Sequence, residues 1–121
     1  MARILISDDD SQVRAMLRQM LERAGYEVAD ARDGKEAIKL YHENPADLVI
    51  TDIIMPEKEG IETIMELKRD YPNIKIFAIS GGGRVGPENY LKLAEKIGAL
   101  RTFTKPFDRQ ELLAAVKQAL E

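Results

Sequence analysis

Short apolar segments alternate with longer amphipathic segments along the whole chain of 121 residues. The apolar segments are rich in isoleucine, leucine and valine, which is typical of strands buried on both faces of a sheet. In the amphipathic segments, apolar residues recur three or four positions apart, as on the buried face of a helix. The pattern predicts strands at 3–7, 26–31, 48–50, 74–79 and 100–104, and helices at 11–24, between Gly34 and Pro45, between Gly60 and Tyr71, at 88–97 and after Asp108.

Strand and helix therefore alternate five times. This alternation predicts an α/β fold in which a parallel sheet has helices on both faces, joined by right-handed crossovers. The connections are short and no segment repeats, so residues 1–121 are expected to form one domain. The chain ends with the last helix, and we expect no attached effector domain.

Individual residues mark the ends and the inner faces of the helices. Ser11 and Asp108 are expected N-caps, because their side-chain oxygens can accept hydrogen bonds from free amides of the first turn. Gly25 and Gly98 fit the positions just after a helix. The third helix is marked by apolar residues at helical spacing, among them a methionine expected in the core: Ile61, Ile64, Met65 and Leu67.

Composition and charge exclude several classes of protein. The formal net charge is −3 and no segment concentrates lysine or arginine, which argues against a nucleic-acid surface. The chain has no cysteine, so disulfides and thiolate metal sites are excluded. No apolar run approaches the roughly 20 residues of a membrane span. A location in the cytoplasm is expected.

Polar side chains follow four of the predicted strands. Asp8 and Asp9 come after the first strand, Asp52 after the third, Ser80 after the fourth and Lys105 after the fifth. In a parallel sheet these strand ends meet at one edge, which is where ligands of α/β proteins bind. Each residue alone could be an ordinary helix cap or surface residue, as expected for Asp10 and Asp108. The joint placement of the five residues favours a functional site.

The chemistry of this set indicates a cation and an anion. Three carboxylates repel one another and raise one another's pKa unless a cation joins them. A cluster of oxygen ligands suits a hard divalent cation such as Mg²⁺. Lys105 and Ser80 would stabilise an anionic group with three oxygens attached at Asp52.

Three segments resemble one known family: Ile4-Leu5-Ile6-Ser7-Asp8-Asp9, Asp52-Ile-Ile-Met-Pro and Lys105-Pro-Phe. Together they resemble the receiver domain of two-component response regulators, of the single-domain chemotaxis type. The likeness covers the whole chain. It implies the flavodoxin-like strand order 2-1-3-4-5. It also implies a signalling module rather than a dedicated turnover enzyme.

The resemblance implies a role for each matching residue. Asp52 would accept a phosphoryl group from the phosphohistidine of a kinase or phosphotransfer protein. Asp9 and Asp52 would bind Mg²⁺ directly, with the backbone carbonyl of Ile54 as a third ligand and Asp8 acting through water. Lys105 and Ser80 would bond phosphoryl oxygens, and the resulting change would be read by a downstream protein. A monomer or weak dimer is expected.

Two positions depart from the family pattern. Thr102 stands where an aromatic switch residue is usual, and Phe103 beside it is expected in the core. The segment Gly81–Gly86 matches G-x-G-x-x-G between a strand and a helix. A dinucleotide fingerprint belongs on the first strand–helix turn, which here holds the aspartates that would repel a pyrophosphate. A mobile signalling loop is the preferred interpretation of the glycine segment.

Two other functions compete with this reading. One is an Mg²⁺-dependent hydrolase that works through an aspartyl phosphate. Such enzymes usually need a second aspartate two residues after the nucleophile, where this chain has Ile54, and a cap domain. The other is a binding scaffold that is never phosphorylated, against which the intact set of Asp8, Asp9, Asp52 and Lys105 argues.

Overall fold

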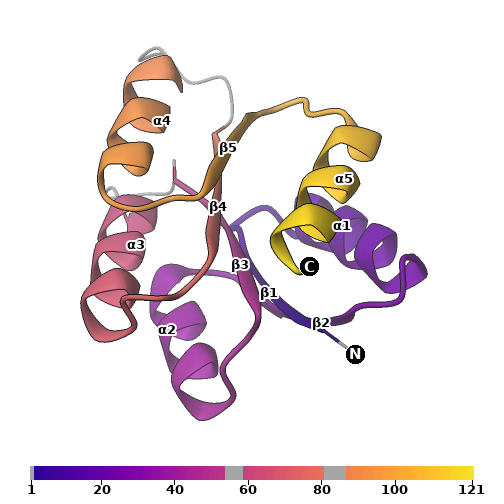
Figure 1. The fold of residues 1–121 in the computed structure, drawn as a ribbon, viewed down its shortest axis with the longest axis horizontal. Coiled ribbons are helices and arrows are strands. Elements are labelled where there is room, and N and C mark those ends of the chain that lie inside the picture. Colours follow the sequence, from indigo (N-terminus) through magenta and orange to yellow (C-terminus); the bar gives the residue numbers. More distant parts are fainter. Residues whose placement is uncertain (1, 54–58, 81–86) are drawn as a thin grey trace.

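The computed structural model describes residues 2–53, 59–80 and 87–121. Its centre is one parallel sheet of five strands in the order β2-β1-β3-β4-β5 (Figure 1). The predicted flavodoxin-like order is therefore confirmed. The strands are β1 (Arg3–Ser7), β2 (Glu27–Ala31), β3 (Leu48–Asp52), β4 (Ile76–Ser80) and β5 (Arg101–Thr104).

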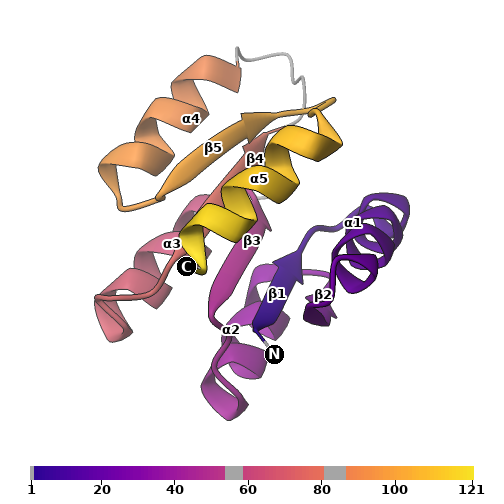
Figure 2. The same cartoon turned by 45° about the vertical axis from the view of Figure 1, so that its right-hand side comes forward.

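Helices cover both faces of this sheet. One face packs against α1 and α5, and the other against α2, α3 and α4 (Figures 1 and 2). The prediction of a doubly wound architecture is confirmed. The helices are α1 (Ser11–Arg23), α2 (Gly34–Glu43), α3 (Glu59–Asp70), α4 (Pro87–Lys96) and α5 (Arg109–Ala119).

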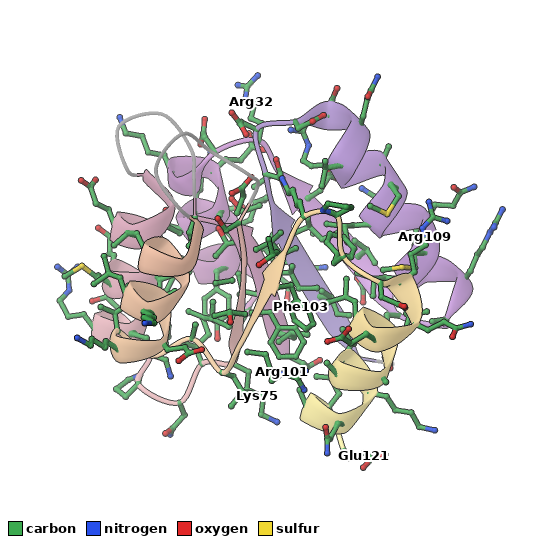
Figure 3. All side chains as sticks on the ribbon, turned by 90° about the horizontal axis from the view of Figure 1, so that it is seen from above. Arg32, Lys75, Arg101, Phe103, Arg109 and Glu121 are labelled. Carbon is green, nitrogen blue, oxygen red and sulfur yellow. The ribbon has the colours of Figure 1, made fainter. Side chains whose placement is uncertain are left out.

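Two hydrophobic cores lie on opposite faces of the sheet, because successive strand residues point to opposite sides. In β1, Ile4 and Ile6 join the core under α1 and α5, whereas Leu5 joins the core under α2, α3 and α4. Phe103 of β5, labelled in Figure 3, is buried, as predicted. The centroid of its ring lies 5.5 Å from that of the Phe77 ring. The two cores hold the strands between helical layers.

Two local predictions were wrong. Asp10, not Ser11, is the N-cap of α1: its Oδ1 accepts hydrogen bonds from the amides of Gln12 at 2.9 Å and Val13 at 3.4 Å. Ser11 already belongs to the helix. Met65 is 54% exposed and faces solvent, because the other apolar residues of α3 already fill the side toward the sheet.

The ends of four strands also differ by one or two residues from the predicted bounds. β2 begins at Glu27, β3 extends to Asp52, β4 runs from Ile76 to Ser80 and β5 begins at Arg101. Before β4, the amide of Ile74 donates to the carbonyl of Tyr71, so that residue closes a turn instead of joining the sheet. Among the described residues, no helix has the length and apolar character of a membrane span.

The N-cap of α1 gives a direct test of this local structure. Replacing Asp10 by Ala should lower the free energy of unfolding by about 1 kcal/mol, because the amides of Gln12 and Val13 lose their acceptor. Ser11→Ala is the matched control and should change it by less than about 0.5 kcal/mol. Urea unfolding in the presence of a chelator measures both. An equal loss in the two variants would contradict the assignment.

Candidate functional site

The site lies where the carboxyl ends of neighbouring parallel strands meet. Ser7 of β1 pairs in register with Thr51 of β3, so the next residues, Asp8 and Asp52, emerge side by side. Lys105 follows β5 and is tied to β4 by a 2.8 Å hydrogen bond from its amide to the carbonyl of Ser80. The parallel sheet thus brings residues from three distant segments to one edge.

Lys105 joins two carboxylates in this cluster. Its Nζ lies 2.9 Å from Oδ2 of Asp8 and 2.8 Å from Oδ2 of Asp52. Both aspartates are buried, with exposures of 1% and 4%. Asp9 is exposed beside them, and carboxylate oxygens of all three aspartates lie within 4.8 Å of one another. The sequence prediction that these four side chains meet is confirmed.

The surroundings of Asp8 and Lys105 shift their proton affinities. Burial raises the pKa of Asp8, and the charge of Asp52 raises it further, while hydrogen bonds from the Asp10 amide at 2.8 Å and from Lys105 oppose the rise. Burial alone would lower the pKa of Lys105. Its contacts with Asp52 and Asp8 outweigh burial and raise that pKa above its usual value. Lys105 therefore stays charged at neutral pH.

The donor set fits a hard divalent cation. Its three side chains offer only carboxylate oxygens, which are the ligands that Mg²⁺ prefers. Three carboxylates face a single ammonium group, so negative charge remains in excess after the pairing with Lys105. Asp9 is exposed, so the cluster opens to solvent. Asp8, Asp9 and Asp52 are thus suited to hold Mg²⁺ at this edge.

The other residues singled out in the sequence lie outside this cluster of four side chains or outside the described residues. Ser80 is the last residue of β4 and is fully buried, one strand away from Asp52. Ile54 and the segment 81–86 lie outside the described residues. Thr102, at the usual aromatic position, is half-buried and its hydroxyl donates to Oε1 of Glu95 on α4 at 3.4 Å. That hydrogen bond links β5 to α4.

Sequence reasoning missed Gly60 as a part of the site. A Cβ at this position would lie 2.3 Å from the carbonyl oxygen of Asp52 and 2.4 Å from Cα of Ile53. The start of α3 therefore packs directly on the backbone that holds Asp52, and only glycine leaves room for it. In the sequence Gly60 looks like an ordinary loop end, because its close approach to Asp52 and Ile53 exists only in the folded structure.

Comparison with known proteins now identifies the fold and its family. The family model of the response regulator receiver domain matches residues 4–117. This chain belongs to that family. Receiver domains are signalling modules of two-component systems, and the resemblance drawn from the aspartate and lysine segments is confirmed.

Relatives of similar length support this assignment. The chain is 38% identical to the chemotaxis protein CheY of Thermotoga maritima over 96% of this chain and 95% of that protein. It is 31% identical to the sporulation initiation phosphotransferase F of Bacillus subtilis, over 98% and 93% of the two chains. A receiver domain structure from Clostridium thermocellum superposes with a TM-score of 0.90 at 32% identity, covering 99% and 94% of the chains.

The contact of α3 with β3 in this receiver domain can be tested with Gly60→Ala. The added methyl group must displace backbone at Asp52 and Ile53, so the free energy of unfolding should fall by about 2 kcal/mol. Met65→Ala on the exposed side of the same helix should change it by less than about 0.5 kcal/mol. Denaturant unfolding measures both. Full stability of Gly60→Ala would show that the helix adjusts without strain.

The buried carboxylate of Asp8 makes a second prediction for the receiver domain. Because its pKa is raised above 3.8, the folded protein binds a proton where the unfolded chain has lost it, and stability falls as pH rises through that window. At a pH above the raised pKa, Asp8 is ionised in the folded protein, and burial of its charge lowers the free energy of unfolding by the full amount. Asp8→Asn should therefore raise the free energy of unfolding at pH 7 without metal by about 1 kcal/mol.

The control for this change is Asp9→Asn, because Asp9 is exposed. It should alter stability by less than about 0.5 kcal/mol. Thermal or urea unfolding between pH 4 and pH 8 in a chelator, at constant ionic strength, compares the three proteins. A loss of stability in Asp8→Asn would mean that the contact with Lys105 outweighs the cost of burial.

Proposed function

We propose that this chain is a phosphorylation-controlled module of a two-component system and that Asp52 is its phosphoacceptor. The observation that supports the proposal is the buried Asp52 carboxylate, held 2.8 Å from Lys105 at the open edge of the sheet beside Asp8 and Asp9. In this proposal residues 1–121 form a single receiver domain.

The proposed reaction moves a phosphoryl group from a phosphohistidine to Asp52. A carboxylate oxygen of Asp52 attacks phosphorus, a P–O bond forms, and the P–N bond to the imidazole breaks. The imidazole nitrogen keeps the electron pair of the broken bond. Phosphoryl transfer needs positioning and charge neutralisation more than covalent assistance. Lys105 supplies a charge already in place, and its raised pKa keeps that charge throughout the neutral range.

Three carboxylates and one backbone group form the proposed metal site. Following the family resemblance, Asp9 and Asp52 would hold Mg²⁺ directly, Ile54 would contribute its backbone carbonyl, and Asp8 would act through a water molecule. When bound, the cation would neutralise charge on the phosphoryl oxygens. Asp8, held by the Asp10 amide and by Lys105, keeps its carboxylate aimed at this site.

The signal in this proposal is a change of shape at the ends of β4 and β5. Ser80, fully buried at the end of β4, turns to donate to a phosphoryl oxygen. This movement of Ser80 shifts a two-state surface. A histidine kinase or phosphotransfer protein supplies the phosphoryl group, and a downstream protein reads the change or receives the group. The chain acts as a monomer or weak dimer in the cytoplasm.

The proposal is tested by incubating the protein with Mg²⁺ and a small acyl phosphate, followed by intact-mass measurement. Wild type should gain one phosphoryl group, and Asp52→Ala should gain none because the attacking oxygen is absent. Asp70→Ala is the control, since this exposed carboxylate on α3 lies outside the cluster. A chelator should abolish the gain.

Each contrary outcome has its own meaning. Labelling of Asp52→Ala as strong as wild type would remove Asp52 as the acceptor. An unlabelled wild type would favour the unphosphorylated scaffold. Continuous release of inorganic phosphate over many turnovers, without an accumulating phosphoprotein, would favour the hydrolase.

A further inference from the structure

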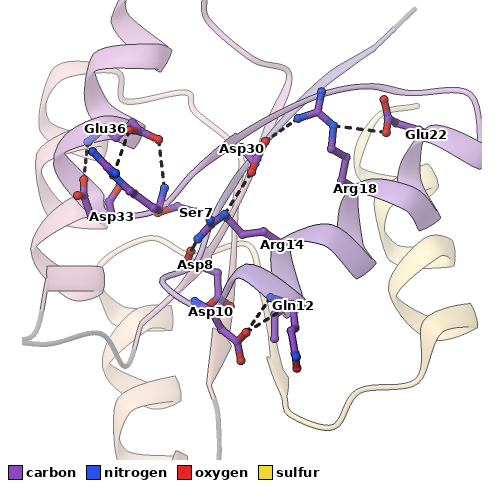
Figure 4. Close-up of polar contacts among 12 residues, drawn as sticks. Ser7, Asp8, Asp10, Gln12, Arg14, Arg18, Glu22, Asp30, Asp33 and Glu36 are labelled. Atoms are coloured by element: carbon purple, nitrogen blue, oxygen red, sulfur yellow. Dashed lines mark hydrogen bonds and ion pairs between the residues drawn. The ribbon is translucent and has the colours of Figure 1, made fainter.

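An arginine on α1 connects the site to the end of β2. Nη1 of Arg14 donates to the backbone carbonyl of Asp8 at 2.6 Å, and its Nε donates to Oδ2 of Asp30 at 3.2 Å (Figure 4). Asp30 belongs to β2, the strand beside β1. The side chain of Arg14 is 18% exposed, so it lies against the protein rather than in solvent.

The peptide groups on both sides of Asp8 are connected to β2, one by a direct hydrogen bond and the other through Arg14. The amide of Asp8 donates to the carbonyl of Ala31 at 3.1 Å. The carbonyl of Asp8 is held through Arg14, whose position is set by Asp30. This carbonyl belongs to the peptide bond that joins Asp8 to Asp9, so its orientation helps to set where both carboxylates point.

We propose that Arg14 is a positioning residue for the cation site and that Asp30 acts through it. A guanidinium group suits this task because its planar fork donates in two fixed directions at once. Arg14 is not expected to touch the cation. It fixes the peptide between Asp8 and Asp9, and thereby presents two carboxylates in the geometry that Mg²⁺ requires. The inference rests on the proposed function, since it concerns the same metal site.

Whether Mg²⁺ binds more weakly or more tightly after Arg14 is replaced shows whether Arg14 acts by positioning the site or only by its charge. Arg14 is a cation close to an acidic cluster, so removing its charge alone should strengthen the binding of another cation. Losing its hydrogen bond to Asp8 should weaken that binding. Arg18 supplies the matched control: it is also on α1, and its contacts go to Oδ1 of Asp30 at 2.5 Å and Oε1 of Glu22 at 3.4 Å (Figure 4).

The first experiment measures the dissociation constant of Mg²⁺ from amide NMR shifts at residues 8–10, at fixed ionic strength. Arg14→Ala should weaken binding about tenfold, the lower end of what loss of a supporting partner costs. Arg18→Ala should stay within about twofold of wild type or bind more tightly. Arg14→Lys, which can still donate to the Asp8 carbonyl but not in two fixed directions, should fall between wild type and Arg14→Ala.

A double-mutant comparison tests whether Asp30 acts through Arg14. Asp30→Ala should weaken Mg²⁺ binding, and the double variant Arg14→Ala with Asp30→Ala should bind no more weakly than Arg14→Ala alone. Independent, additive losses would overturn this link. Unfolding measurements on each variant establish that the compared proteins are folded, since a general loss of structure would reduce stability and binding together.

A metal-free measurement keeps the test independent of the proposed function. Amide hydrogen exchange at Asp8 and Asp10 should be faster in Arg14→Ala than in Arg18→Ala, because only the former frees the peptide between Asp8 and Asp9. If wild type binds no Mg²⁺, the proposed metal site fails while exchange still decides the role of Arg14. Unchanged exchange in Arg14→Ala, tighter Mg²⁺ binding, or equal effects of the two arginines would overturn the proposal.

Discussion

The ammonium group of Lys105 lies between two buried carboxylates, and the rest of the site depends on that charge. Taking an unpaired carboxylate out of water costs several kcal/mol, and here Asp8 and Asp52 are both buried within a few ångströms of each other. One lysine faces two neighbouring carboxylates. Burial is the main cause of the raised pKa of Asp8, and the charge of Asp52 raises it further. The site is therefore an electrostatically costly arrangement that a bound cation would relieve.

Several parts of the fold together hold these charged residues in place. Parallel pairing brings the ends of β1 and β3 level, so two acidic residues emerge together. Two cores on opposite faces fix the strands. Gly60 lets α3 begin directly against the carbonyl of Asp52, which leaves that backbone little freedom to withdraw. The candidate site thus lies where two buried strands and the start of α3 meet.

The sequence predicted those features of the fold and the site that depend on a pattern repeated along the chain. Alternating segments predicted the sheet, and polar residues after four strands predicted that Asp8, Asp52 and Lys105 would meet. Choices between neighbours were harder: Asp10 and Ser11 are both good caps, and only the backbone decides which one is helical. Met65 has core spacing, but the sheet-facing side of α3 was already filled. Arg14 resembles any helix arginine until β2 is placed beside β1. The roles of Ser80 and Ile54 stay predictions.

The double contact of Lys105 also bears on how the site would respond to a phosphoryl group. A phosphorylated Asp52 would present new oxygens, and Lys105 could reach them only by giving up part of its hold on the carboxylates. Asp8 would then lose one of its two side-chain partners, but it would keep the Asp10 amide. Its own peptide groups remain bound to Ala31 and Arg14, neither of which involves the lysine. Because the segment is held by its backbone, Lys105 could change partners while Asp8 and Asp9, two of the proposed metal ligands, stay in place.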